Sequence, residues 1–225
     1  MIHSRLSAHD YSAAPTPVEV RSLFNGIVLA DWTEAMIARG FGWHVDIGAF
    51  STPITGGGAG TILDQDQPEG VIGVPTGWVL VPLRILVACQ VPLLAADSDE
   101  SEILIAADRL ANYAVGGGTV VTETPSNMRT NVTSGCPLTT VSAASGDITN
   151  PTLGIELGHA VIIGESGSDV GRNWTDLALK YEPLTPPFIV GPSALYVYFG
   201  GTVATTGFVN MDFLAIPSSL VTNLA

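Results

Sequence analysis

The chain has 225 residues, of which 46% are apolar and only 13% are charged. Its 25 glycines and 15 prolines suit short strands joined by turns and exclude a helical bundle, whose surface would need many more charged residues. The net charge of −13, from 21 acidic and 8 basic residues, excludes nucleic acid and anionic membranes as partners, because such a surface repels phosphate groups.

The N-terminal segment, residues 1–17, is polar and ends in AAPTP, which predicts a flexible arm ahead of a single β-sandwich domain over residues 18–225. The arm also lacks the apolar region of a secretory signal. The segment DWTEAMIARG that follows is predicted to form the one short helix, with Asp31 as its N-cap and Gly40 as its end.

The rest of the chain alternates between strand-like segments and clusters of Gly, Pro, Asn and Ser, which is typical of an all-β protein. About nine strands are expected, and because no long helices alternate with them, we predict an antiparallel β-sandwich of jelly-roll type. The linker GGTVATTG between the last two strands predicts a hairpin or a closely related return. The expected strands are GWHVDIGAF (42–50), GVIGV (70–74), the run 77–94, SEILIAA (101–107), GTVVTET (118–124), PLTTVSA (137–143), GIELGHAVII (154–163), ALYVYF (194–199) and FVNMDFLAI (208–216).

The longest apolar run is GWVLVPLRILVACQVPLL, residues 77–94. Its repeated prolines would break a membrane-spanning helix. Read with a period of two, every second residue from Val79 to Val91 falls on one side, which predicts a long strand. Pro82 cannot donate to a neighbouring strand, so it indicates an edge position, a bulge or a bend.

The opposite side of this strand is too apolar for solvent and carries an arginine, a composition that is typical of subunit contacts. The strand 194–199 also has apolar or aromatic residues on both sides. We therefore expect a homo-oligomer, with a trimer favoured, although a loop or helix of the same chain could cover these faces instead. The candidate interface residues are Trp78, Leu80, Arg84, Leu86, Tyr196 and Tyr198.

No two of the four histidines fall at a metal-ligand spacing. His44 and His159 are interpreted as ordinary strand or loop residues, and no cofactor is expected. Two acidic clusters leave calcium as an alternative, although the first lacks the glycine of a calcium loop and the second reads as a solvated loop. The clusters comprise Asp64, Asp66 and Glu69, and Asp97, Asp99, Glu100 and Glu102.

The motifs of nucleophilic catalysis and phosphate binding are also incomplete. GESGSD at 164–169 does not match a nucleophile elbow, and the glycine runs lack the lysine of a phosphate loop. Cys89 and Cys136 are interpreted as two thiols rather than a disulfide framework. These patterns predict no catalytic residues, so we expect a protein that is not an enzyme.

The overall residue pattern of residues 20–216 resembles that of the jelly-roll capsid cement, or decoration, proteins of tailed bacteriophages. The resemblance is clearest in the stretches GWVLVPLRILVACQ and ALYVYFGGTVATTGFVNMDF. The resemblance implies a non-enzymatic homotrimer in the virion, assembled in the host cytoplasm, that clamps neighbouring copies of the major capsid protein or other virion proteins. The alternative is a carbohydrate- or receptor-binding domain of a tail fibre or lectin-like module, which would hold sugar through Trp43, Trp78 or Trp174. A β-sandwich hydrolase is a third alternative.

Overall fold

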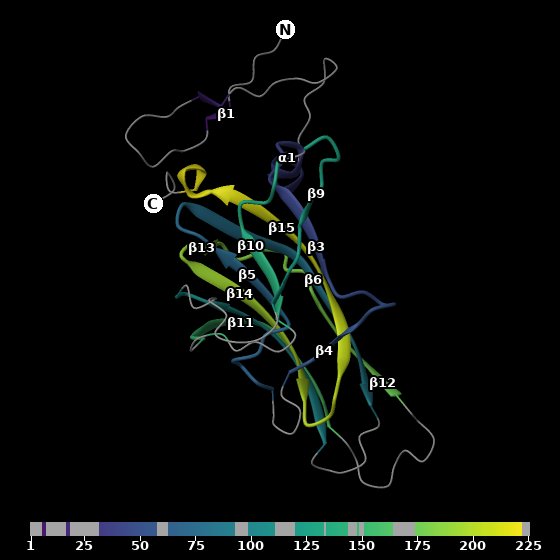
Figure 1. Cartoon of the computed structure of the whole chain (residues 1–225). Helices are drawn as coiled ribbons and strands as arrows, with labels where there is room; N and C mark the ends of the chain where they lie inside the picture. The colour runs from purple at the N-terminus through teal and green to yellow at the C-terminus, as the bar shows by residue number, and fades with distance from the viewer. Residues whose placement is uncertain are drawn as a thin grey trace.

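The computed structural model is an antiparallel β-sandwich with one α-helix, which confirms the predicted all-β fold. The helix and a short 3₁₀ helix lie at the same end of an elongated body (Figure 1). The structure describes residues 6–7, 17–18, 32–57, 63–92, 99–110, 120–132, 134–143, 148, 151–163 and 174–221.

The first layer is a seven-stranded sheet in which β6 and β15 are the long inner strands. Its main path runs β12-β6-β15-β3-β9, with β13 paired to β6 and β4 paired to β15. The bounds are α1 Trp32–Ala38, β3 Gly42–Ile47, β4 Ile54–Thr55, β6 Trp78–Pro92, β9 Ser126–Asn127, β12 Trp174–Tyr181, β13 Ile189–Val190, β15 Thr206–Pro217 and the 3₁₀ helix Ser218–Leu220.

The second layer is a six-stranded sheet with the order β11-β7-β14-β5-β10-β8. A separate two-stranded pair, β1 with β2, belongs to the N-terminal segment, most of which lies outside the described residues, as does Asp31. The bounds are β1 Leu6–Ser7, β2 Pro17–Val18, β5 Gly70–Val74, β7 Glu100–Asp108, β8 Val120–Thr122, β10 Thr139–Ala143, β11 Leu153–Ile163 and β14 Ser193–Gly201.

The main hydrophobic core fills the space between the two sheets, as alternation along each strand requires. The seven-stranded sheet contributes residues such as Ile85 and Met211, and the six-stranded sheet contributes residues such as Ile105 and Val197. The edge strands β11 and β12 contact each other, so the two layers meet along that side.

Every strand predicted from the sequence is present, and α1 ends at Ala38, two residues before the predicted stop at Gly40, whose φ of 89° favours glycine. The strand β12 was missed, although Leu177, Leu179 and Tyr181 repeat with the period of a strand. The connection between β14 and β15 is a return from one sheet to the other, because the two strands belong to different sheets and do not form a hairpin.

The prediction that one side of β6 holds every second residue from Val79 to Val91 is wrong. A register irregularity falls where Asp212 pairs with Arg84 and Phe213 pairs with Pro82, so Leu83 is the extra residue of a β-bulge. Before the bulge the even-numbered residues of β6 face the core, whereas after it the odd-numbered residues do. Pro82 also lies in the gap between the segments of β6 that pair with β12 and with β13.

The two strand faces that we assigned to a partner subunit are covered largely by the chain itself. Leu80 points into the main core, and Tyr196 and Tyr198 lie under the described residues Leu63 and Ile148; all three of the predicted interface side chains are fully buried. Their assignment to a subunit interface is therefore corrected. Sequence periodicity shows that a strand face is apolar but cannot show which segment covers it.

Candidate functional site

The outer face of the seven-stranded sheet divides into three zones along its strands. Near α1 it is apolar, where Val79 and Leu214 pack with Ile37 of the helix. The middle zone is polar, and the far zone is a shallow apolar groove. Because residues directly opposite one another in an antiparallel pair share a face, β6 and β15 place side chains of all three zones on the same outer surface.

The middle zone is a hydrogen-bonded network centred on His44. The ring Nδ1 of His44 lies 2.7 Å from Oδ1 of Asp212 on β15, and its Nε2 lies 3.1 Å from Oδ1 of Asp46, two residues along β3. The side-chain amide of Asn210 donates to Asp46. On β6, a guanidinium nitrogen of Arg84 lies 3.8 Å from the other carboxylate oxygen of Asp212. The network therefore links three neighbouring strands.

Electrostatics favour a positively charged His44. Partial burial by itself would lower the pKa of the imidazole, but the hydrogen bonds and charges of Asp212 and Asp46 outweigh it, and the pKa is raised above its usual value of 6.5. The Arg84 Nε atom is buried and has no hydrogen-bond partner in the part of the chain that the structure describes.

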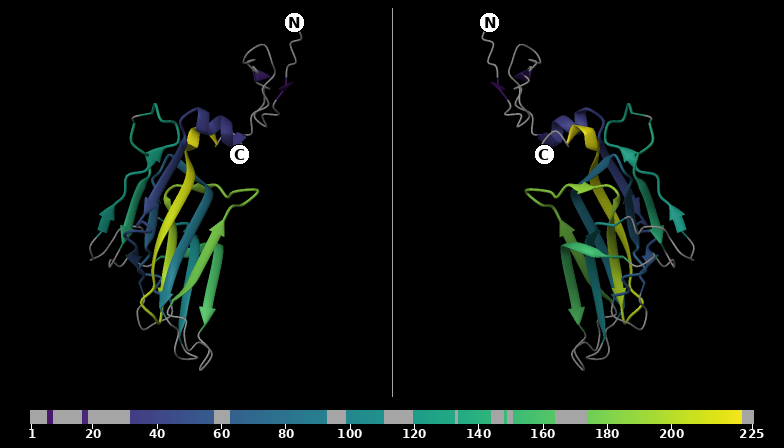
Figure 2. Two further views of the ribbon diagram at one scale, coloured as in Figure 1. Left: turned by 90° about the vertical axis from the view of Figure 1, so that its right-hand side faces the viewer. Right: turned by 90° about the vertical axis from the view of Figure 1, so that its left-hand side faces the viewer.

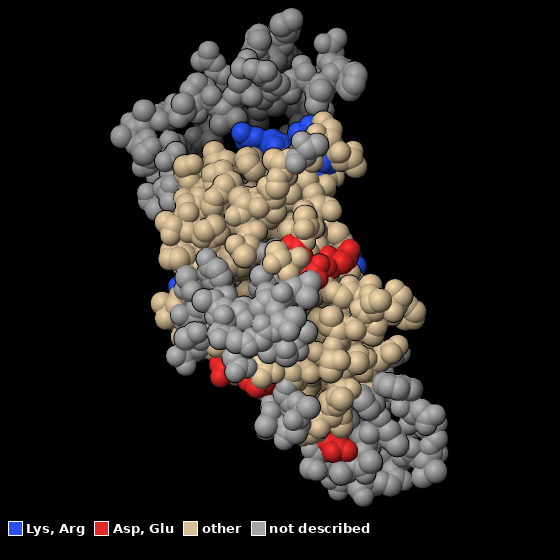
Figure 3. All heavy atoms as spheres, viewed as in Figure 1, with Lys and Arg blue, Asp and Glu red and all other residues tan. Residues whose placement is uncertain are grey.

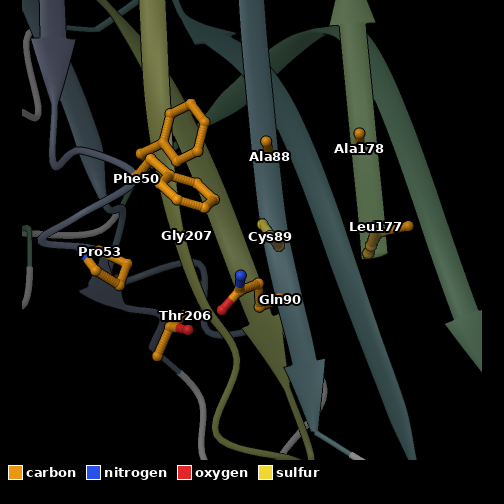
Figure 4. Close-up of a pocket in the computed structure, with 10 residues that line it drawn as sticks. Phe50, Pro53, Ala88, Cys89, Gln90, Leu177, Ala178, Thr206 and Gly207 are labelled. Atoms are coloured by element: carbon orange, nitrogen blue, oxygen red, sulfur yellow. The ribbon is translucent and has the colours of Figure 1, made fainter. Parts of the chain in front are cut away.

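The far zone is a groove of about 290 Å³ between β12, β6, β15 and the loop that follows β3 (Figure 4). Ala88 and Ala178 form a small-residue floor, and Phe50 forms one wall. The Phe50 side chain is 79% exposed. Gln90 and Thr206 supply polar groups beside it.

A second exposed apolar surface lies on the loop between β12 and β13, which projects from the sandwich near the end that carries α1 (Figure 2). Leu184 at this loop is fully exposed, and Phe188 and Val190 are about half exposed. The ring of Phe188 contacts that of Trp32 from α1, with centroids 5.7 Å apart. We call these four residues the loop patch. In the sequence, the signal for this surface is the segment EPLTPPF, residues 182–188, in which apolar residues alternate with prolines outside any strand pattern.

The other three predicted interface residues lie on β6, and Trp78 is next to the loop patch, because its backbone oxygen accepts the N–H of Gly191 at 3.0 Å, one residue beyond Val190. Arg84 and Leu86 are half-buried on the outer face of β6, in and beside the polar network. Trp78 is half-buried and packs against the main core. The structure therefore leaves only Arg84 and Leu86 of the six on an open sheet face.

The described members of the acidic clusters do not converge on a shared point, and Asp97 lies outside the described residues. Glu69 turns inward, and its two oxygens accept hydrogen bonds from the backbone N–H groups of Gly57 and Phe199 at 2.5 and 2.7 Å. Asp64 accepts the backbone N–H of Asp66 within its own turn. In the second cluster, Glu102 pairs with His159 at 3.2 Å. Among the described residues no three His, Cys, Asp or Glu side chains are grouped to hold a metal ion.

The two cysteines and Trp43 lie in surroundings that are typical of residues with a role in packing. Cys89 and Cys136 are free thiols, and burial raises their pKa values to about 12 and about 11, which suppresses the reactive thiolate. Trp43 belongs to the main core. The side chain of Trp174 lies outside what the structure describes.

Charge is unevenly spread over the face shown in Figure 3, where basic side chains gather near α1 and acidic ones lie farther along the body. At the α1 end, Arg129 donates to the backbone oxygen of Ala38 at 2.7 Å, and Arg39 lies over the ring of Phe41. Within the described residues, no helix has the length and apolar character needed to cross a membrane.

No protein-family model matches the chain, and no curated protein matches it either.

Proposed function

We propose that this chain is a non-enzymatic structural subunit of a viral particle, a capsid cement or decoration protein of the tailed-bacteriophage type, that acts as a homo-oligomer. The observation that carries the proposal is the loop patch. After the chain has covered most of its strand faces itself, Leu184 and Phe188 on the projecting loop, Val190 on β13 and Trp32 on α1 still expose apolar surface. Clustered exposed apolar side chains of this kind mark contacts with other proteins.

The proposal differs from the sequence-based expectation in where contact occurs. The strand faces of β6 and β14 are largely used within the chain, so association with copies of itself or with capsid subunits is assigned to the loop patch. A proline-containing loop is suited to this role because it loses little conformational freedom when a partner binds.

Native mass spectrometry at micromolar concentration tests the proposal. We expect an oligomer, with a trimer favoured, and Leu184→Asp should shift it to monomer while leaving the circular dichroism spectrum unchanged. Val161→Asp, which alters an exposed apolar side chain on the other sheet, is the matched control and should leave the oligomer intact. Wild-type protein that is monomeric and does not bind assembled capsid shells would contradict the proposal.

A second candidate function, carbohydrate binding by a tail-fibre or lectin-like module, is favoured by the groove. An exposed aromatic ring beside amide and hydroxyl groups suits a sugar, whose apolar face stacks on the ring while its hydroxyls form hydrogen bonds. Phe50 takes the role that the sequence assigned to tryptophans, since Trp43 is buried. Glycan-array binding that Phe50→Ala abolishes would favour this function over the first.

A further inference from the structure

Both ring nitrogens of His44 face carboxylate oxygens, at 2.7 Å from Asp212 and 3.1 Å from Asp46. An ionised carboxylate only accepts hydrogen bonds, and a neutral imidazole carries one N–H. A neutral ring can therefore satisfy only one of these contacts and places its lone pair against the other carboxylate. Only the doubly protonated ring donates to both.

The charges that face His44 come from each strand packed around it. Its own strand β3 contributes Asp46, and β15 contributes Asp212 and the neutral Asn210. On β6, Arg84 approaches Asp212, and on β9 the residue opposite His44 is the uncharged Ser126. Two carboxylates and one guanidinium leave a single negative charge, which an imidazolium neutralises.

We propose that His44 is a pH-sensitive fastener: its charged ring ties β3 to β15 through Asp212, whereas its neutral ring loses the charge attraction to Asp212 and can donate to only one of its two carboxylates. The position of β3 gives this loss a mechanical consequence. The whole length of β3 pairs with β15 on one side, whereas on the other side β9 pairs only with Trp43 and His44 of β3. β3 therefore depends on β15 for its attachment, and loss of the fastener weakens one edge of the seven-stranded sheet.

The direction of the pH effect follows from linkage. A histidine whose pKa is higher in the folded than in the unfolded protein stabilises the fold fully below its unfolded value of about 6.5. That stabilisation is lost as the pH rises through the folded pKa. The edge at β3 is thus held more tightly in mildly acidic than in alkaline solution.

Two measurements on the full chain test the fastener. In ¹⁵N-labelled protein, the imidazole of His44 should titrate with a midpoint above 6.5, and Asp212→Asn should lower that midpoint. In thermal unfolding, the loss of Tm caused by His44→Gln should be larger at pH 6 than at pH 9.

His159→Gln is the matched control, because His159 pairs with the single carboxylate of Glu102 on the other sheet. It should leave the midpoint of His44 unchanged. A wild-type His44 midpoint at or below 6.5 would overturn the proposal, as would a Tm loss in His44→Gln that is the same at both pH values. The wild-type titration decides the question even if His44→Gln fails to fold.

Discussion

At the scale of single residues, Glu69 carries a carboxyl group held almost entirely inside the protein, with 1% of the residue's surface exposed. Its two oxygens accept the N–H groups of Gly57 and Phe199, so it joins the segment after β4 to β14. Gly57 also forms a bridge to Gly200, where a Cβ would lie 1.9 Å from the Gly57 oxygen. The close approach of these two backbones requires glycine, and Glu69 satisfies the donors around it.

Glu69 should make the fold less stable as the pH rises. Burial raises the pKa of Glu69 from 4.5 to about 8, despite the opposing backbone hydrogen bonds. The folded protein therefore retains a proton that the unfolded chain releases, and between these two values stability falls with increasing pH. At about 1.4 kcal/mol per pH unit, the loss is at most on the order of 5 kcal/mol.

Urea unfolding at pH 5 and at pH 8.5 checks this prediction. We expect the difference in unfolding free energy between wild type and Glu69→Gln to change between the two pH values, with wild type losing more stability than the variant as the pH rises. Glu156→Gln, an exposed acid on β11, is the control and should follow wild type. A parallel response of wild type and Glu69→Gln would show that Glu69 is ionised throughout.

At the scale of secondary-structure elements, the bulge at Leu83 decides what each half of β6 does. Before the bulge, Val79 and Val81 face α1 and Leu80 faces the core; after it, Ile85 and Val87 face the core. Without the extra residue, one half of the strand would turn its core residues outward, because a shift of one position exchanges the faces of a strand.

Leu80 and Leu86 form a matched pair that tests the bulge, since an unbroken alternation would place them on one face. Leu80→Asp should prevent folding, because losing a buried leucine costs about 2–5 kcal/mol and the buried carboxylate adds to that cost. Leu86→Asp should fold, because Leu86 lies half-buried on the outer face opposite Asn210. Circular dichroism and thermal unfolding of both variants provide the measurement.

At the scale of the whole molecule, the net charge of −13 acts on stability through self-repulsion. The screening length falls from about 30 Å at 0.01 M salt to about 8 Å at 0.15 M. We therefore expect the Tm to rise between these two salt concentrations at pH 7. The same comparison near the sequence pI of 4.4 should show little change, and a Tm at pH 7 that is insensitive to salt would contradict the prediction.

The sequence by itself determined the fold class and most of the strands, because a period of two and turn-forming residues act locally. The run 70–74 was predicted at its observed bounds, and Pro82 indicated the irregularity in β6. The sequence also showed that the strand 194–199 is apolar or aromatic on both sides. These features depend on neighbouring residues along the chain.

Only the tertiary structure decided what covers each strand face and which side chains meet. Tyr196 and Tyr198 are buried by segments far away in the chain, and His44 meets Asp212 across 168 positions of sequence. The loop patch likewise depends on the fold, because its exposed apolar side chains come from the loop before β13, from β13 itself and from α1. Contacts of this kind depend on how the sheets pack, because burial is a property of the folded surface and not of a residue or its neighbours in sequence.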